Sequence, residues 1–360
     1  MKKKESLQTL ITAAGLALGI SAAAAETTLM VGDAAPKLQV AKWVQGEPVK
    51  QIEAGKAYVV EFWATWCGPC RVSIPHLNEL HQKFKDKNLV FIGQDCWERD
   101  ETLVEPFVKK MGEKMTYRVA MDDKSQEKKG AMAVTWMEAA GQNGIPSAFI
   151  VNKQGKIAWI GQPMTMKEEL LDEVLSDRHD LAKAAADYAR QEKTKQEAQG
   201  LSVKLNKSLA SKNWDDAEAA VAELEKSLPD AGRDNYLMVR FQILVGRGKH
   251  DEAYKLAGDF SAAHPDNAMM QNELAWTIAT APGLEKRDLG LAEKIAERAV
   301  TASQRKDPSI LDTLARVQFM NGKKQQAVQT QEKALELAPD DVKNQFKSSL
   351  ESYKAGKLPD

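Results

Sequence analysis

Two short apolar runs and one amphipathic stretch predict the core of the first half of the chain. Ala57 to Val60 and Leu89 to Ile92 are continuous apolar runs, which is typical of strands buried on both faces. Residues 71–84 lie between them and repeat apolar side chains at helical spacing. These helix positions are Val72, Ile74, Leu77, Leu80 and Phe84. The pattern therefore predicts a strand, a helix and a second, parallel strand.

Weaker patterns predict the remaining elements of this α/β region. Trp43 to Ile52 contains Gly46 and Pro48 and predicts a short β-hairpin. Gly144 to Asn152 predicts a turn and then a strand, and residues 153–156 predict a hairpin turn into a last strand. The other expected elements are helices over residues 101–111 and 127–140 and strands over residues 115–121 and 157–161.

The pattern changes after Lys167, where strand character ends and long helical runs begin. Leu170, Leu171, Val174 and Leu175 are expected to complete the α/β domain. Residues 177–200 are charged, rich in alanine and free of proline, and their only glycine is Gly200, so they predict a helical connector. The predicted domains are 26–176, the connector 177–200, and an all-α region over 201–360.

The all-α region carries a degenerate repeat. Ala217, Ala253 and Ala327 are each followed by a proline twelve residues later, and Ala292 fits the same frame with a late proline at 308. The spacings between these four alanines are 36, 39 and 35 residues. This period resembles that of tetratricopeptide repeats, in which small residues let paired helices approach closely. By that resemblance the array would bind a protein or peptide, and residues 342–354 would form a capping helix. The alternative is a helical array that only supports or dimerises the α/β domain.

The N-terminus has the pattern of an export signal. Lys2 to Lys4 form a basic segment, Leu7 to Ile20 an apolar segment, and Ala23 to Ala25 a small-residue cleavage site. We expect residues 1–25 to be removed near Ala25, and the alternative is an uncleaved anchor. Export together with a pair of closely spaced cysteines indicates an oxidising compartment, most simply a bacterial periplasm.

Composition narrows the possible functions. The formal net charge is -1, so nothing in the charge balance points to nucleic acid. The chain has three cysteines, which are too few for a disulfide-stapled scaffold and indicate that cysteine is used for chemistry. A zinc site built on Cys67 and Cys70 is disfavoured because no second Cys/His pair has suitable spacing, so no metal is expected.

Cys67 and Cys70 form a Cys-x-x-Cys motif where the first strand passes into the helix. Unpaired N–H groups and the helix dipole stabilise a thiolate at such a position. In these motifs the pKa of the attacking thiol falls to roughly 3.5–7.5. Two thiols one helical turn apart can open or close a disulfide by exchange.

The segment Phe62-Trp63-Ala64-x-Trp66-Cys67-Gly68-Pro69-Cys70 resembles the active-site segment of thioredoxins. Pro75 matches the proline that kinks the family's active-site helix, and Glu61 falls where thioredoxins place a buried acid. The export signal, the opening Val31-Gly32-Asp33 and a long insertion before Pro146 resemble the TlpA/ResA-like periplasmic proteins of this family. The resemblance implies a thioredoxin-like α/β fold with a central mixed sheet flanked by helices. ResA-like proteins carry an acid three residues after the second cysteine, where this chain has Ser73.

The resemblance also implies roles for individual residues. Cys67 is the nucleophile and Cys70 the resolving thiol, and no bound cofactor is required because the Cys67–Cys70 disulfide carries the electrons. Ile145-Pro146-Ser147-x-Phe149 resembles the family's cis-proline loop, so the Ile145–Pro146 bond is expected to be cis and to form a substrate platform. Substrate contact is assigned to Trp66, Gly68, Pro69, Ile145 and Pro146.

The roles of two residues stay open. Glu61 either shuttles a proton to and from Cys70 or is held idle by a lysine such as Lys56. Cys96 either serves as a third redox thiol near the carboxyl edge of the sheet or is a buried thiol that behaves as a small apolar residue.

The functional prediction is an exported thiol–disulfide oxidoreductase that reduces protein disulfides. By resemblance its partners are protein dithiols and disulfides and an inner-membrane electron donor. One alternative is a scaffold protein of the cell envelope in which the repeat region is the functional part. Another is a disulfide isomerase or oxidant, because the Gly68-Pro69 dipeptide alone does not fix the reduction potential.

Overall fold

The computed structural model describes residues 27–227, 232 and 234–359, so the predicted signal peptide at residues 1–25 lies outside the described residues. Within this part the chain forms two units, one ending at Lys195 and the other beginning at Gln196. The boundary falls inside helix α4 (Leu181–Ala210), which covers most of the predicted connector. No helix among the described residues is both long and apolar enough to cross a bilayer.

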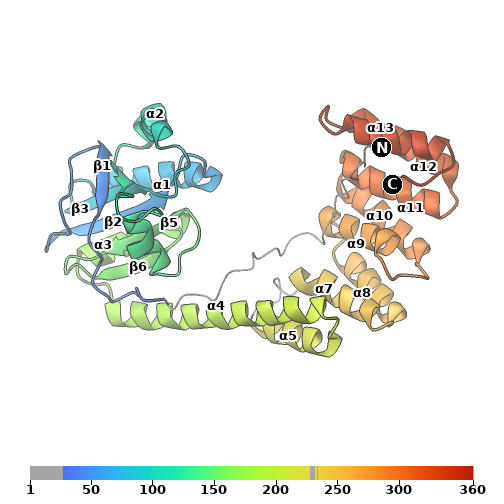
Figure 1. Cartoon of the computed structure of the whole chain (residues 1–360), viewed down its shortest axis with the longest axis horizontal. Coiled ribbons are helices and arrows are strands. Elements are labelled where there is room, and N and C mark those ends of the chain that lie inside the picture. The colour runs from blue at the N-terminus through green and yellow to red at the C-terminus, as the bar shows by residue number, and fades with distance from the viewer. Residues whose placement is uncertain (1–26, 228–231, 233, 360) are drawn as a thin grey trace, which may run out of the picture. The chain divides into compact units, whose positions relative to one another are not determined.

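The first unit is built on a six-stranded mixed sheet with the strand order β1-β4-β3-β2-β5-β6 (Figure 1). Strands β2, β3 and β4 are parallel to one another, whereas β1, β5 and β6 pair antiparallel with their neighbours. The predicted thioredoxin-like α/β class is therefore confirmed. The strands are β1 (Val40–Gln45), β2 (Ala57–Trp63), β3 (Leu89–Asp95), β4 (Arg118–Asp122), β5 (Ser147–Val151) and β6 (Ile157–Gly161).

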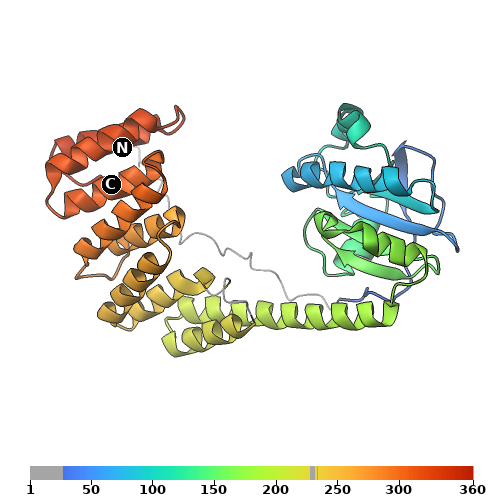
Figure 2. The same cartoon turned by 180° about the vertical axis from the view of Figure 1, so that it is seen from behind.

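Three helices cover one face of the sheet, and a second layer that includes a π-helical segment covers the other. Alternate residues of β2 point to opposite sides, so Val59 packs with α1, α2 and α3 while Val60 packs with the second layer. The helices α1 and α3 lie on the same side of the sheet in Figure 2. The second layer contains a π-helical segment and the first turns of α4. The helical elements of this unit are α1 (Gly68–Phe84), η1 (Glu101–Leu103), α2 (Val104–Met111), η2 (Gly112–Lys114), η3 (Ala133–Glu138), η4 (Pro163–Thr165) and α3 (Glu168–Leu175).

Two local predictions are wrong in form. Residues 43–52 do not form a hairpin, because β1 ends at Gln45 and pairs antiparallel with β4, which is distant in sequence. Gly46 follows with φ +77, a conformation that favours glycine, and an added Cβ would lie only 2.8 Å from Cγ of Arg118. The helix expected over residues 127–140 begins only at Ala131 and continues as the π-helix η3 (Ala133–Glu138). Its start is fixed by Asp122, whose carboxylate accepts hydrogen bonds from the N–H groups of Met132 and Ala133, both at 2.8 Å.

The second unit is helical throughout its described secondary structure, as predicted (Figure 1). The four alanines of the predicted repeat frame, Ala217, Ala253, Ala292 and Ala327, are all fully buried, which allows neighbouring helices to approach closely. The extra residues around Pro282 and Gly283 form the loop between α9 and α10. The assignment to the tetratricopeptide class stays a prediction. The elements are α5 (Trp214–Lys226), η5 (Asp234–Tyr236), α7 (Leu237–Gly246), α8 (His250–Ala263), α9 (Ala268–Thr280), α10 (Leu289–Ala302), α11 (Pro308–Met320), α12 (Lys324–Leu337) and α13 (Lys343–Lys354).

Candidate active site

The two cysteines of the motif stand at the junction of β2 and α1. All seven residues of β2 are buried, and the strand leads through a short turn to Cys67, which caps the N-terminus of α1. Pro69 lies in the first turn of the helix, where the missing N–H costs nothing. The predicted placement of a thiol at a helix N-terminus is confirmed.

Cys67 and Cys70 are joined by a disulfide, with their Cα atoms 5.3 Å apart. The Cys70 N–H donates to Sγ of Cys67 at 3.1 Å, which is the capping interaction of the helix. Cys67 is 3% exposed and Cys70 is completely buried, so an incoming group can reach only the first sulfur. When the pair is reduced, the same N–H and the helix dipole would stabilise a Cys67 thiolate.

The proline loop lies against this disulfide. The Ile145–Pro146 bond is cis, as the sequence predicts. The carbonyl oxygen of Ile145 is 3.7 Å from Sγ of Cys67. The sheet explains the approach, because Ser147 starts β5 opposite Phe62, close to the end of β2. A substrate chain that reaches Cys67 therefore meets the backbone of Ile145.

Glu61 is buried in the middle of β2, with 1% of its surface exposed. Its carboxylate accepts hydrogen bonds from the Tyr117 hydroxyl at 2.9 Å and from the Ser73 hydroxyl at 3.2 Å. Burial nevertheless raises the pKa of Glu61 to about 8, since these two hydrogen bonds only partly oppose it. A carboxyl with this pKa can both hold and release a proton near neutral pH.

Ser73 connects Glu61 to the second cysteine. Its hydroxyl oxygen lies 3.1 Å from the carbonyl oxygen of Cys70 as well as 3.2 Å from Glu61, and it can donate to only one of them at a time. The alternative in which Lys56 holds Glu61 is wrong, because Lys56 pairs with Glu53 at 2.7 Å instead. Glu61 therefore has neutral hydrogen-bond donors beside it, and no lysine of the described part of the chain forms an ion pair with it.

The outer rim of the site is apolar and exposed. Trp66 is 41% exposed, and Gly68 and Pro69 next to it are also exposed. The Trp66 ring is held by a hydrogen bond from its N–H to the carbonyl oxygen of Trp97 at 3.1 Å. The Arg99 guanidinium lies 4.7 Å from the centre of the same ring. The structure thus brings all the sequence-predicted site residues to one region, with Glu61 beneath and the others around the disulfide.

Arg71 and Glu98 support the active-site turn, Asp95 interacts with Glu98, and none of the three was predicted. The Arg71 guanidinium donates to the carbonyl oxygen of Thr65 through Nη2 at 2.6 Å and Nε at 3.2 Å. The carboxylate of the buried Glu98 accepts a hydrogen bond from the Thr65 N–H at 2.7 Å. Burial, together with the nearby Glu98 carboxyl, raises the pKa of Asp95 to about 8. One sequence signal was available, since Asp95 and Glu98 mark the carboxyl end of a parallel strand next to the cysteine strand.

Cys96 is free and completely buried. It packs among residues of the second layer of the unit, while Cys67 and Cys70 pack in the first. Burial raises the pKa of the Cys96 thiol well above its usual range, and the Asp95 and Asp122 carboxyls add to the effect. These features favour the alternative in which Cys96 behaves as a small apolar residue. No cluster of three His, Cys, Asp or Glu side chains suited to a metal ion occurs among the described residues.

Known proteins are similar to the first unit of this chain. The Redoxin family, by its family model, matches residues 30–175. Protein FixW of Rhizobium leguminosarum is 31% identical over 155 residues, which cover 41% of this chain and 67% of FixW. Thiol-disulfide oxidoreductase ResA of Bacillus thuringiensis subsp. konkukian is 31% identical over 146 residues, which cover 40% of this chain and 77% of ResA. The chain belongs to the ResA-like thiol–disulfide oxidoreductases.

One solved structure is similar to about the same share of this chain as ResA is. A thiol-disulfide isomerase from Corynebacterium glutamicum is 20% identical, with a TM-score of 0.33, and the match covers 40% of this chain and 96% of that one. The Redoxin match ends before the second unit begins. The family assignment therefore describes the unit that carries Cys67 and Cys70, and it makes this unit a thioredoxin-like oxidoreductase.

Proposed function

We propose that the protein is an exported reductant of protein disulfides in which Cys67 is the nucleophile and Cys70 the resolving thiol. The observation that carries the proposal is the asymmetry of the pair. Cys67 caps α1 and faces the Ile145 carbonyl, whereas Cys70 is completely buried behind it. Only Cys67 is placed to meet a bulky substrate.

The proposed reaction has two exchange steps. The Cys67 thiolate attacks one sulfur of the substrate disulfide, and the other substrate sulfur leaves and takes up a proton. Cys70 then loses its proton to Glu61 and attacks Sγ of Cys67, which forms the Cys67–Cys70 disulfide and releases the second substrate thiol. The substrate gains two electrons and two protons, and the protein's dithiol is oxidised.

Substrate contacts are proposed from the groups around Cys67. The Ile145 carbonyl beside Cys67 would accept a hydrogen bond from the substrate backbone, and Pro146 shapes the loop. Trp66, with Gly68 and Pro69, offers the exposed apolar surface on which the substrate chain would lie. A backbone contact of this kind accepts many sequences, which suits a general reductant of protein disulfides.

The oxidised pair must be reduced again before the next cycle. We propose that a dithiol protein of the inner membrane donates these electrons. The reaction then needs no bound cofactor, because the Cys67–Cys70 pair holds both electrons. The predicted export signal at residues 1–25 supports a periplasmic location, where newly exported proteins acquire disulfides.

The second unit is proposed to make protein contacts. On its α9 and α11, Trp276 and Arg316 lie together, with the guanidinium 5.2 Å from the ring centre, and both side chains are partly exposed. Asn272 and Asp312 lie one turn earlier on the same two helices. If the protein acts primarily as a scaffold, the full-length Cys67→Ser variant will keep its cellular function and the Trp276→Ala variant will lose it. If the protein acts primarily as a reductant, Cys67→Ser will lose the function and Trp276→Ala will keep it.

The function is tested by electron transfer to a protein with accessible disulfides. The full chain, reduced with dithiothreitol and freed of it, is mixed with oxidised insulin, and the thiols are alkylated and mapped by mass spectrometry. The expected result is loss of the Cys67 and Cys70 thiols in step with the appearance of insulin thiols, while Cys96 stays reduced. Retention of both thiols in the presence of insulin disulfide would overturn the proposal.

Glu61→Gln is expected to slow the resolving step by about 10- to 100-fold near pH 8, because an amide cannot accept the Cys70 proton. The variant keeps a side chain of the same shape that can still accept from the Tyr117 hydroxyl. The ratio of wild-type to variant rates should rise with pH until Glu61 is ionised, near pH 8, and then level off.

The measurement is stopped-flow resolution of a preformed mixed disulfide between Cys67 and a chromogenic thiol. Glu79→Gln is the matched control, because Glu79 is an exposed acid on α1. A rate ratio that stays constant between pH 6 and 9 would remove Glu61 from the proton transfer.

A further inference from the structure

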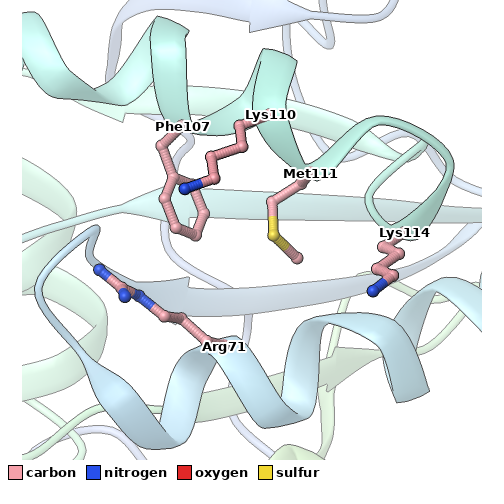
Figure 3. Close-up of a pocket in the computed structure, with 5 residues that line it drawn as sticks. All are labelled: Arg71, Phe107, Lys110, Met111 and Lys114. Atoms are coloured by element: carbon pink, nitrogen blue, oxygen red, sulfur yellow. The ribbon is translucent and has the colours of Figure 1, made fainter.

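A hollow of about 300 Å³ lies between α1 and α2, and the redox chemistry does not use it. Figure 3 shows the side chains that line it, with Arg71 extending from α1 and the others from the opposite segment. Its lining consists of Arg71, Phe107, Lys110, Met111 and Lys114. Three of these five side chains are cationic, two are apolar and none is acidic.

The hollow begins at the active-site turn. Arg71 directly follows Cys70, and its guanidinium donates to the carbonyl oxygen of Thr65, two residues before Cys67. The same guanidinium lies 5.6 Å from the centre of the Phe107 ring. Arg71 thus belongs both to the support of the active-site turn and to the rim of the hollow, so the hollow lies next to this turn.

The cationic groups of the hollow have no acidic partners. Among the described residues, neither Arg71 nor Lys110 nor Lys114 takes part in an ion pair. Of the nearby acids, Glu105 is occupied by Lys42, and Glu113 does not line the hollow. Three unpaired positive charges around one depression attract negative charge from a partner.

The floor of the hollow is apolar. Phe107 and Met111 are partly buried and pack against the core layer beneath α1 and α2. Leu103, one turn before Phe107, is 50% exposed. A small inorganic anion would leave this apolar floor unused, whereas a peptide segment can place a carboxylate on the rim and an apolar side chain on the floor.

We propose that this hollow binds an acidic segment of the substrate protein that lies next to the disulfide to be reduced. Carboxylates of the segment pair with Lys110, Lys114 and the free edge of Arg71, while an apolar neighbour rests on Phe107 and Met111. The segment is thereby held so that its cysteine meets Cys67. This proposal rests on the proposed function, and it adds a substrate preference that the Cys-x-x-Cys chemistry does not contain.

The test compares three peptides that carry the same disulfide loop, flanked by aspartates, by glutamines or by lysines. The full-length protein should reduce the aspartate peptide with a kcat/KM roughly tenfold above that of the glutamine peptide at low ionic strength, and the lysine peptide should be the poorest substrate. Salt near 0.5 M should reduce the difference to about twofold, because exposed charges are then screened.

The decisive variant is the double substitution Lys110→Ala with Lys114→Ala, which leaves Arg71 and the active-site turn intact. It should reduce the glutamine peptide at the wild-type rate and lose the preference for aspartate. The matched control is Lys50→Ala with Lys128→Ala, which removes the same charge from exposed positions elsewhere in the first unit and should keep the preference. A preference for aspartate that survives the loss of Lys110 and Lys114, or no preference in the wild type, overturns the proposal.

Failure of the proposed function would be recognised separately. If the glutamine peptide is not reduced at all, the redox role itself is wrong, and the hollow is then tested by fluorescence anisotropy with a labelled aspartate peptide whose cysteines are replaced by serine. Binding to the wild type that weakens about tenfold in the double variant supports the hollow as an acidic-segment site. Equal binding to both proteins contradicts it.

Discussion

Replacing Cys67 with serine is expected to lower the rate of disulfide reduction by at least about a thousandfold, the largest effect of any single substitution. Cys67 caps the N-terminus of α1 and is 3% exposed, whereas Cys70 is completely buried behind it. A serine hydroxyl is not ionised at neutral pH and cannot attack a disulfide. Rates are measured with the glutamine-flanked disulfide peptide and a chemical reductant to regenerate the dithiol.

Cys70→Ser should give a different result, because attack by Cys67 does not need the second thiol. The substrate is then expected to remain attached through Cys67 and to be isolated as a mixed disulfide under non-reducing conditions. Cys96→Ser serves as the control and should leave turnover unchanged, since Cys96 is a free thiol buried in the other core layer. Turnover by the Cys67→Ser protein, or trapping through Cys96, would contradict the assignment of roles.

Replacing Glu61 with glutamine is expected to stabilise the first unit at alkaline pH. In the folded protein burial raises the pKa of Glu61 to about 8 from a usual value of 4.5. Below pH 4.5 the carboxyl is protonated in both states and contributes no pH-dependent difference. Between pH 4.5 and 8 the unfolded state releases the proton first, so stability falls as the pH rises, and the loss is complete above pH 8.

The size of this effect follows from the same shift. The full loss corresponds to roughly 3–5 kcal/mol, which the variant avoids because glutamine does not ionise. Urea unfolding followed by tryptophan fluorescence reports mainly on the first unit, since six of the eight tryptophans precede residue 196. The variant's stability relative to wild type should increase between pH 4 and 9 by that amount, whereas Glu79→Gln should show no such increase. A pH-independent difference would mean that Glu61 ionises normally inside the fold.

The sequence predicted the centre of the first unit because its signals there are local. A buried strand, a Cys-x-x-Cys motif and an amphipathic helix follow one another within a short stretch, so the turn that joins them needs no distant partner. The cis bond at Pro146 and the burial of Glu61 were also predicted, since each comes from a motif with a fixed place relative to the cysteines.

The parts that were missed depend on partners far apart in the chain. β1 finds its partner in β4, more than seventy residues later, and local turn residues wrongly favoured a hairpin. The support of Thr65 by Glu98 and by Arg71 joins side chains whose meeting only the assembled sheet decides. The hollow between α1 and α2 likewise depends on the packing of two helices and leaves no pattern in the sequence.

The repeat frame of the second unit illustrates an intermediate case. The spacing of Ala217, Ala253, Ala292 and Ala327 predicted positions where helices pack closely, and all four side chains are fully buried. The same spacing carries no information on which residues remain exposed to a partner. Trp276 and Arg316 come together only because α9 and α11 are neighbours in the array.

The central claim is that the Cys67–Cys70 pair acts as a reductant, and its reduction potential tests this most directly. The full-length protein is equilibrated against a graded series of oxidised and reduced dithiothreitol, and the redox state of the pair is read by mass spectrometry after alkylation. We predict a value near or below about -230 mV, in the range of thioredoxin-type reductants that depend on a dithiol donor. A value of roughly -120 to -180 mV would place the protein with disulfide oxidants and isomerases and contradict the proposed direction of electron flow.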